Sequence, residues 1–372
     1  FQKTLIKHLG SRFDDERVKR VHYLAAKWFA DKGFINEALD QFIKSGKVEE
    51  AVETIRINAH NEYLNNVGKV ETWLSKLPLD VIENNPELQI VKAWYAFGQF
   101  QLEKIPPILE KVNFLIQGTV PNPQLSSELS FFQGNFQYWM GDTQGSIRSL
   151  DKSLNQNDDL PEHVRCNARL VRFLALQRSG QYDKAVKEVH SMIKRTDKYT
   201  RMDIAYSWGS LTFLHLLSGH LRSTLDAAVQ MQKFTKKIGA HYLLNWSKYL
   251  QALVNLQWFQ LDKAFDLFAV TGEKHQILDT KAVFDSKVSL ALIHQLNGNS
   301  RRANEVISAT AVTAKEMGDL QSLNLVQSAQ SRIALLQGDI PAAFQSADAF
   351  HEPPSFPAMF FWQEIPHMTK AK

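Results

Sequence analysis

Residues 204–229 read IAYSWGSLTFLHLLSGHLRSTLDAAV and contain the pattern that decides the fold. The part that ends at Leu217 is apolar on nearly every side, which is typical of a helix covered by neighbours on two sides. Gly219 follows, and glycine commonly ends a helix because it adopts a left-handed conformation at no steric cost. Five residues later, the small Thr224 opens a second stretch with helical apolar spacing. The pattern predicts two antiparallel helices joined by a tight turn.

The same phrase, a glycine with a small residue five positions later, recurs along the chain. Its members are Gly141 with Ser146, Gly180 with Ala185, Gly219 with Thr224, Gly298 with Ala303, and Gly338 with Ala343, while Phe259 with Ala264 fills the gap. With Gly98 placed in front, the steps between first positions are 43, 39, 39, 40, 39 and 40 residues. A steady period of this length indicates a helical-repeat protein.

Each repeat has room for two helices of about 15 residues and two short turns, slightly more than the ~34 residues of a tetratricopeptide repeat. The small residue lies one turn into the second helix, where a larger side chain would hold the two helices apart. We therefore predict an all-α superhelix, an α-solenoid of tetratricopeptide-like helical hairpins with a period of about 40 residues. In such a stack the first helix of each pair also contacts the next repeat and lines the inner surface.

The beginning of the chain has a tighter rhythm. Gly33 with Ala38 and Gly46 with Ala51 lie 13 residues apart, so the segment from Val21 to Ile57 is expected to hold three short helices. A turn at Asn84-Asn85-Pro86 should lead into the regular array. The proline-rich breaks at Pro121–Pro123 and Pro353–Pro357 are expected to be loops between helices, because they are too short for domain linkers.

The composition describes a folded protein, with 44% hydrophobic and 22% charged residues. Cys166 is the one cysteine and cannot form an internal disulfide, which fits a reducing compartment. No run approaches the roughly 18 to 20 apolar residues of a membrane helix, and a net charge of +4 with mixed signs does not favour direct nucleic-acid binding. We expect a cytoplasmic protein without membrane contact. Because the chain begins with Phe1 instead of Met, we expect it to be part of a longer protein.

Motifs for catalysis and for metal binding are missing from the sequence. The pairs Gly46-Lys47 and Gly68-Lys69 are each followed by Val, so neither forms a phosphate-binding loop. The 12 histidines form no close group with Cys166 or with each other, and no Gly-x-Ser-x-Gly elbow occurs. We therefore predict no enzyme activity, no catalytic residue and no metal site in this chain.

Several charged or titratable groups are explained better by helix ends than by chemistry. The acidic pairs Asp14-Asp15 and Asp158-Asp159 fit helix capping, and the cluster Lys233, Lys236 and Lys237 fits a helix C-terminus. His215 and His220 flank a helix end and, being five apart, would not share a helix face. We expect them to be turn or surface histidines.

Aromatic residues gather on the predicted first helices. They are Tyr206, Trp208, Tyr242, Trp246, Tyr249 and Phe284. Most of them are expected to fill the core. Tyr and Trp carry a polar group as well as an apolar ring, so some of them could instead face a groove that stacks on a sugar or holds a peptide.

Several phrases of the chain resemble the sensor region of MalT-like regulators, which are LuxR-type bacterial transcription activators built around a signal-transduction ATPase. In the first part of the chain these are residues 24–29 (LAAKWF), 33–38 (GFINEA), 73–78 (WLSKLP) and 85–88 (NPEL). Later ones are residues 241–244 (HYLL), 285–286 (DS), 290–292 (LAL), 334–339 (ALLQGD) and 364–366 (EIP). Residues 1–9 resemble the end of the winged-helix segment that follows the ATPase module in that family.

The resemblance implies a division into residues 1–58, the end of a winged-helix segment and a short helical arm, and residues 59–372, a tetratricopeptide-like sensor domain. It implies that the sensor binds an inducer, either a small molecule or a regulatory protein, and relays it to an ATPase module outside this chain. That module would use ATP and magnesium and drive self-association of the parent protein. DNA would be bound only by a C-terminal module that this chain lacks. No cofactor is expected in the chain itself.

The candidate effector-binding residues are Tyr206, Trp208, His241, Tyr242, Trp246 and Asp285. His241, Tyr242 and Asp285 lie in the family-like phrases on first helices, although structural hydrogen bonds between repeats would also explain them. Two other functions stay open: a general scaffold that recruits a partner protein, and, less favoured, an enzyme that uses the superhelix as a substrate cradle.

Overall fold

A computed structural model of the chain describes residues 14–62, 67–99, 101–156, 159–273, 280–349 and 362–370. Throughout these residues the regular structure is helical, with no strand. The predicted all-α repeat fold is therefore confirmed. In the described part of the chain, no helix is both long and apolar enough to cross a bilayer. The chain divides into two compact units, one ending at Pro121 and one beginning at Asn122.

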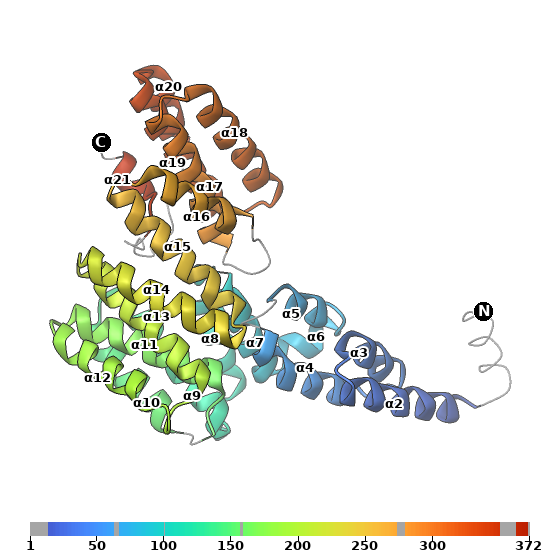
Figure 1. Cartoon of the computed structure of the whole chain (residues 1–372). Helices are drawn as coiled ribbons and strands as arrows, with labels where there is room; N and C mark the ends of the chain where they lie inside the picture. The colour runs from blue at the N-terminus through green and yellow to red at the C-terminus, as the bar shows by residue number, and fades with distance from the viewer. Residues whose placement is uncertain are drawn as a thin grey trace. The chain divides into compact units, whose positions relative to one another are not determined.

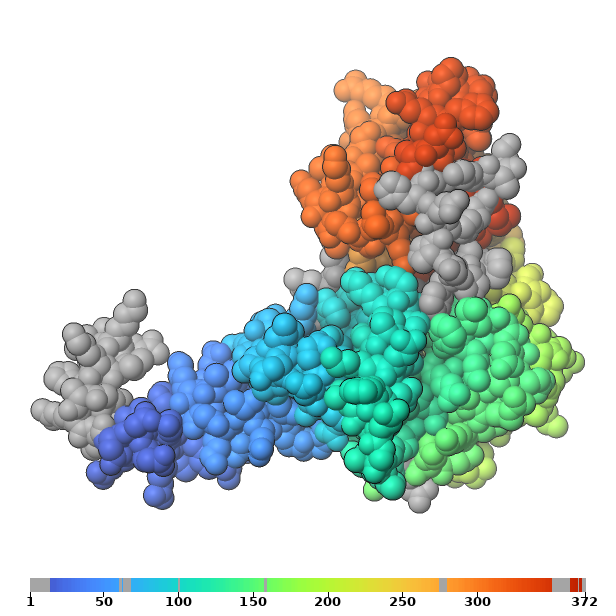
Figure 2. Space-filling view, turned by 180° about the vertical axis from the view of Figure 1, so that it is seen from behind, coloured from blue at the N-terminus to red at the C-terminus, as the bar shows by residue number. Residues whose placement is uncertain are grey.

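The helices of unit 1 include the three expected between Val21 and Ile57, although the first and the third, with 17 and 15 residues, are not short. They are α2 (Asp15–Asp31), α3 (Ile35–Lys44), α4 (Val48–Glu62), α5 (Val67–Leu74), α6 (Leu79–Glu83), α7 (Pro86–Gly98), a 3-10 turn η1 (Leu102–Lys104) and α8 (Ile105–Leu115). Within this unit the colours of Figure 2 run in order from dark blue to teal, so helices that follow each other in sequence are neighbours in space. A core that includes Leu39, Phe42 and Trp73 joins α3 and α5.

Unit 2 is a stack of six helical hairpins, each made of a first helix and a second helix (Figure 1). The pairs are α9 (Pro123–Met140) with α10 (Thr143–Asn155), α11 (Glu162–Arg178) with α12 (Tyr182–Lys194), α13 (Arg201–Leu217) with α14 (Leu221–Ile238), α15 (His241–Gln257) with α16 (Leu261–Gly272), α17 (Thr280–Leu296) with α18 (Ser300–Glu316), and α19 (Leu320–Gln337) with α20 (Ile340–Asp348). A short helix, α21 (Pro366–Lys370), follows.

Two expectations about boundaries need correction. The break at Pro121–Pro123 was expected to be only a loop between helices, yet the two compact units divide there. Gly98 was expected to open the repeat series, but it is the last residue of α7 and has no left-handed backbone. The chain re-enters a helix through η1 and the prolines of α8 at this point, so the regular series begins with Gly141.

The division expected at residue 58 falls inside α4, which runs from Val48 to Glu62. The separate roles given to residues 1–58 and 59–372 stay a prediction. Residues 1–9, Asp158 and Pro353–Pro357 lie outside the described residues.

The turn between first and second helix has the same geometry throughout unit 2. Gly141, Gly180, Gly219, Gly298 and Gly338 all have positive φ values, between 75° and 90°. Phe259 takes the same place with a φ of 58°, and it is the one non-glycine residue with positive φ in the described part of the chain. Its N–H donates to the carbonyl of Leu256 (3.0 Å), and the next N–H, of Gln260, donates to Asn255 (2.9 Å), as at Gly219. Phe259 therefore completes the repeat by accepting a strained backbone.

The small residue five positions after each turn is buried, as predicted. Ser146, Ala185, Thr224, Ala264 and Ala303 are 0% exposed and Ala343 is 3% exposed. The first helices are also buried more widely than the second helices: α15 has twelve buried residues and α16 has four. This difference follows from the stack, in which α11 contacts α9 and α13 as well as its own partner α12.

We predict that Phe259→Gly raises the free energy of unfolding by about 0.5–1 kcal/mol. A left-handed backbone costs a residue with a side chain about 1–2 kcal/mol, and the glycine variant avoids this strain. The greater conformational entropy that glycine loses on folding cancels only part of this stabilisation. The Phe259 side chain is 68% exposed and contributes little packing. Gly219→Ala is the matched control, because a Cβ there meets no atom within 4 Å and only the backbone strain is added, so stability should fall by about 1 kcal/mol. Urea unfolding measures both changes, and a less stable Phe259→Gly variant would contradict the strain.

Candidate functional site

The six residues predicted to bind an effector lie on three first helices of unit 2, but they do not form one exposed group. Tyr206, Trp246 and Asp285 are buried, whereas Trp208 and Tyr242 are partly exposed and His241 is exposed. Tyr206 and Trp208 are on α13, the next three on α15, and Asp285 on α17. Of these six, Trp246 and Asp285 contact the same segment of the chain, which begins at Trp362.

Asp285 is the polar centre of that region. Its carboxylate is 0% exposed and accepts three hydrogen bonds. Tyr249 Oη on α15 donates to Oδ2 at 2.6 Å. The backbone N–H of Gln363 donates to Oδ2 at 3.1 Å, and that of Glu364 donates to Oδ1 at 3.0 Å. A side chain on α17 thus holds the main chain of a segment almost 80 residues further along.

Aromatic rings cover the same region. Trp362 is 5% exposed, and its ring centroid lies 6.0 Å from that of Trp246 and 5.8 Å from that of Tyr249. Lys281 Nζ on α17 lies 5.7 Å from the centroid of the Trp362 ring. Rings at such distances attract each other, and a cation near the ring adds to this attraction.

Groups of α19 and of α21 hold the side chain of Glu364. Its side chain is buried and accepts hydrogen bonds from the hydroxyls of Ser328 and of Thr369, the latter at 2.6 Å. Arg332 Nη1 forms an ion pair with Glu364 Oε2 at 3.2 Å. A buried carboxylate needs such partners, because desolvation of an unpaired charge is costly. We call the surface formed by Trp246, Tyr249, Lys281, Asp285, Ser328 and Arg332 the first-helix site.

Burial decides the electrostatics of Asp285. It raises the pKa of this carboxyl to about 6, although the hydrogen bonds from Tyr249, Glu364 and Gln363 lower it in part. The negative charge of Glu364 also raises the pKa of Asp285. Burial and the neighbouring Asp285 raise the pKa of Tyr249 well above its usual value, so this phenol stays a hydrogen-bond donor.

The sequence identified only part of this site. Tyr249 was assigned to the aromatic first helices but not to the site, and Trp362 was not singled out at all. Residues 364–366 were noted as a family-like phrase, which was the available signal that this segment matters. The hydrogen bond between Tyr249 and Asp285 is a structural contact between repeats, the alternative that was weighed for Asp285. Effector binding by the six residues stays a prediction.

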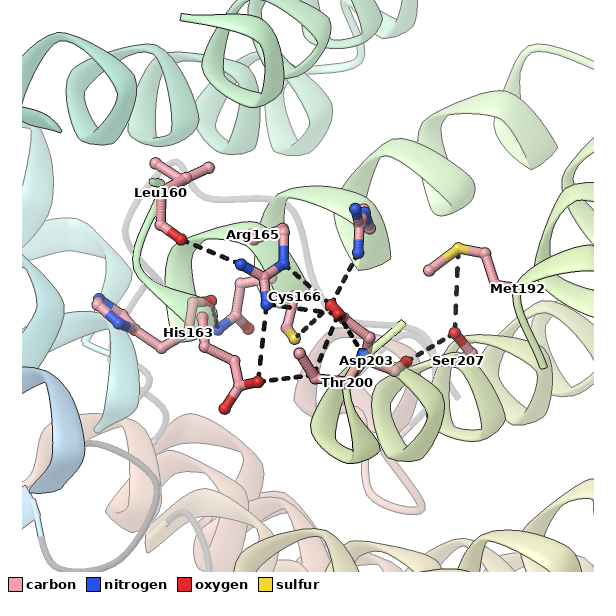
Figure 3. A network of polar contacts seen from close by, with 11 residues as sticks. Leu160, His163, Arg165, Cys166, Met192, Thr200, Asp203 and Ser207 are labelled. Carbon is pink, nitrogen blue, oxygen red and sulfur yellow. Dashed lines mark hydrogen bonds and ion pairs between the residues drawn. The ribbon is translucent and has the colours of Figure 1, made fainter. Parts of the chain in front are cut away.

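A second buried aspartate, Asp203, organises a polar network between α11 and α13 (Figure 3). It is 4% exposed. Arg165 Nε and Arg169 Nη1 bind Oδ1 at 3.1 and 2.7 Å. The N–H of Thr200 donates to Oδ2 at 3.1 Å and closes a capping box at the start of α13. Figure 3 shows Arg165 and Cys166 of α11 pointing toward this carboxylate.

The charges of the Asp203 network are paired. Burial by itself would raise the pKa of Asp203, but Arg165, the Thr200 backbone and Arg169 hold it below its usual value. Burial, with the charge of Asp203, raises the pKa of the Cys166 thiol well above its usual value, which suppresses thiolate chemistry. We interpret this network as a structural link between two repeats.

His215 lies in the last turn of α13 and His220 at the N-cap of α14, so both flank the turn as expected. The turn brings their ring centroids to 6.3 Å. The Nδ1 atoms lie 2.7 and 2.9 Å from Tyr182 Oη. Burial, with the nearby His220 and His190, lowers the pKa of His215. Among the described residues no group of His, Cys, Asp or Glu has the arrangement of a metal site.

An open cavity of about 510 Å³ lies elsewhere in unit 2, between α14, α15 and α16. Its walls combine the apolar Leu225, Val229, Trp258 and Leu267 with polar or charged residues that include Arg222, Gln251, Asn255, Lys263 and Asp266. None of the six predicted residues lines it.

The fold defines the chain as a tetratricopeptide-like helical-repeat protein. No protein-family model matches it. The serine/threonine-protein kinase PknK of Mycobacterium tuberculosis is 31% identical to it over 86 residues, which is 22% of this chain and only 8% of that protein. PknK of Mycobacterium bovis gives the same match. The short match does not establish the family.

Solved structures share the fold at low sequence identity. A Rap protein complexed with competence and sporulation factor has a TM-score of 0.53 at 12% identity, covering 90% of this chain and 86% of that protein. The apo form of the quorum sensor NprR from B. thuringiensis has a TM-score of 0.52 at 12% identity, covering 93% and 90%. A signal transduction ATPase with a tetratricopeptide repeat sensor from Pyrococcus horikoshii scores 0.53 at 12% identity, covering 92% of this chain and 54% of that protein.

We predict that the stability contributed by Asp285 falls as the pH rises from about 4 to about 7. The folded-state pKa of about 6 lies above the ordinary aspartate pKa of 3.8, so the folded chain binds the proton more tightly between these two pH values. The contribution is full below pH ~4, declines by about 3 kcal/mol between pH ~4 and ~6, and is flat above. The measurement is the difference in unfolding free energy between wild type and Asp285→Asn at several pH values. A difference independent of pH would show that the carboxyl titrates normally.

We predict that Asp203→Asn lowers the free energy of unfolding by about 2 kcal/mol at pH 7, because two partly buried arginines lose their partner. The control is Asp226→Asn, whose side chain is 71% exposed and 4.0 Å from Arg222. Loss of such a surface pair costs less than about 0.5 kcal/mol. Chemical denaturation measures both variants, and equal losses would argue against a structural role for the network.

Proposed function

We propose that the chain is the effector-sensing domain of a bacterial transcription activator of the MalT-like type. In this proposal unit 2 binds an inducer on its first helices and relays the binding to an ATPase module elsewhere in the parent protein. The chain itself is cytoplasmic and carries no catalytic group. A stack of repeats suits such a relay, because each hairpin contacts only its neighbours. A change in the position of one hairpin would therefore be passed to the next hairpin along the array.

The observation that carries the proposal is the first-helix site. Side chains from α15, α17 and α19, including Tyr249, Asp285 and Arg332, converge on one segment of polypeptide and hold both its main chain and its side chains. A surface with aromatic rings, a buried carboxylate and a cation can bind a polar ligand with defined orientation. The other predicted residues, Tyr206, Trp208, His241 and Tyr242, lie on α13 and α15 and would extend this surface.

The comparisons support the proposal at the level of fold. A signal transduction ATPase with a tetratricopeptide repeat sensor and the quorum sensor NprR have the same kind of helical array. By this analogy ATP and magnesium would be bound by the ATPase module, self-association would follow activation, and DNA would be bound by a C-terminal module. These parts belong to the proposed parent protein, not to the chain itself.

A thermal-shift screen of metabolites and short peptides tests the proposal. A compound present at about one hundred times its Kd should stabilise the folded chain by about 2.7 kcal/mol and so raise the Tm. We expect the rise to be smaller in Tyr242→Ala and in Asp285→Ala than in wild type. Trp28→Ala serves as the control, because Trp28 is 54% exposed and lies in unit 1.

Hits that stabilise Tyr242→Ala and Asp285→Ala as strongly as wild type would remove the first helices from the proposed binding surface. The reading frame of the parent protein provides an independent check. An ATPase module before this chain and a DNA-binding module after it are expected, and a frame with neither would favour a general scaffold.

A further inference from the structure

The segment Trp362–Lys370 crosses three successive first helices of unit 2. Trp362 contacts Trp246 and Tyr249 on α15 and Lys281 on α17. The N–H groups of Gln363 and Glu364 bind Asp285 on α17. The Glu364 side chain and α21 contact α19. A peptide that lies across the first helices in this way uses the surface that a helical-repeat array offers to a partner.

The first-helix site contacts both the main chain and the side chains of this segment. Asp285 accepts hydrogen bonds from two consecutive backbone N–H groups, which any residue except proline offers. Two side chains add specificity: Trp362 packs against the rings of Trp246 and Tyr249, and the Glu364 carboxylate meets Ser328 and Arg332. The chemistry recognised is therefore an extended peptide with a tryptophan two positions before a carboxylate.

The array beneath the segment has a core of its own. The cluster that joins α17, α18 and α19 contains Phe284, Val288, Ile307, Leu325 and Ile333, and no residue of 362–370 belongs to it. The hairpins α17/α18 and α19/α20 thus pack against each other without the segment. The contacts that hold the segment are mostly polar and are made to side chains of the first-helix surface. These are the properties of a bound peptide that can leave without unfolding its receptor.

We propose that the first-helix site is a binding site for a protein segment with a tryptophan two residues before a carboxylate, and that the segment Trp362–Lys370 of the same chain occupies it at rest. The proposal rests on the proposed sensing function and deepens it, because it identifies the effector as a protein segment rather than a metabolite. A partner segment of this chemistry displaces the chain's own segment. While the chain's own segment occupies the site, the partner cannot bind. The apparent Kd for the partner is therefore the intrinsic Kd divided by the fraction of chains whose site is free.

The test uses a fluorescein-labelled peptide with the sequence of residues 362–370, WQEIPHMTK, and fluorescence anisotropy on the full chain. In the double variant Trp362→Ala, Glu364→Gln the chain's own segment binds weakly, so the peptide should bind at least about tenfold more tightly than to wild type. Adding Asp285→Asn to the double variant should abolish this gain, because the acceptor of the two backbone N–H groups is weakened.

The control is the double variant Trp28→Ala, Glu305→Gln, in which the same residue types change. Trp28 is 54% exposed in unit 1, and Glu305 pairs with Arg301 and Arg302 on the exposed face of α18. Its affinity for the peptide should equal that of wild type. A folded Trp362→Ala, Glu364→Gln variant that binds the peptide no better than wild type overturns the proposal.

A measurement on wild type decides the matter if the double variant does not fold. With excess unlabelled peptide, hydrogen exchange at the N–H groups of Gln363 and Glu364 should accelerate, while the amides of α19 keep their protection. Unchanged exchange at a peptide concentration that saturates the site overturns the proposal, as does a wild-type dimer whose segments are exchanged between copies. Metabolite hits in the thermal-shift screen together with a failed displacement would leave the sensing function intact and refute only this inference.

Discussion

The architecture of unit 2 depends on one backbone constraint, the left-handed residue that follows each first helix. It reverses the chain in a few residues, so that the second helix starts close to the first and packs along it. The buried small residue five positions later, such as Ala185 or Ala303, then lets the two helices approach. Because the same turn recurs six times, the hairpins have one geometry and stack in register. Phe259 shows that the geometry matters more than the residue type, since the chain keeps the turn where a side chain makes it costly.

This constraint explains why so much of the fold was predictable. Glycine and small residues at a fixed spacing are local signals, and they predicted the hairpins, their period and the unusual place of Phe259. The failures were of a different kind. Gly98 shares the residue type but not the conformation, because it is still part of α7 and does not follow the helix in a left-handed conformation. His215 and His220 lie at the turn where they were expected, but their shared contact with the Tyr182 hydroxyl was not predicted, because it joins residues of three elements.

Only part of the first-helix site could be predicted, again because local sequence patterns do not show contacts between distant segments. Trp246 was identified as an aromatic residue of a first helix, and Asp285 because it lies in a family-like phrase on a first helix. Their partners Gln363 and Glu364 are nearly 80 residues away in sequence, and no local pattern links a buried carboxylate to a distant main chain. The two buried aspartates show how far environment decides a residue's role. Asp203 faces two arginines and has a lowered pKa, whereas Asp285 receives only neutral donors and has a raised one.

Recognition of main chain by Asp285 has a consequence for how the sequence can change over time. The two N–H groups that it binds are present with any residue except proline at position 363. This contact therefore places little constraint on which residue stands there. Positions 362 and 364 carry the discriminating side chains and can drift only together with the rings and hydroxyl groups that face them. Related chains could therefore come to recognise different segments through coordinated substitutions at a few facing positions, while the carboxylate on α17 keeps the register of every segment the same.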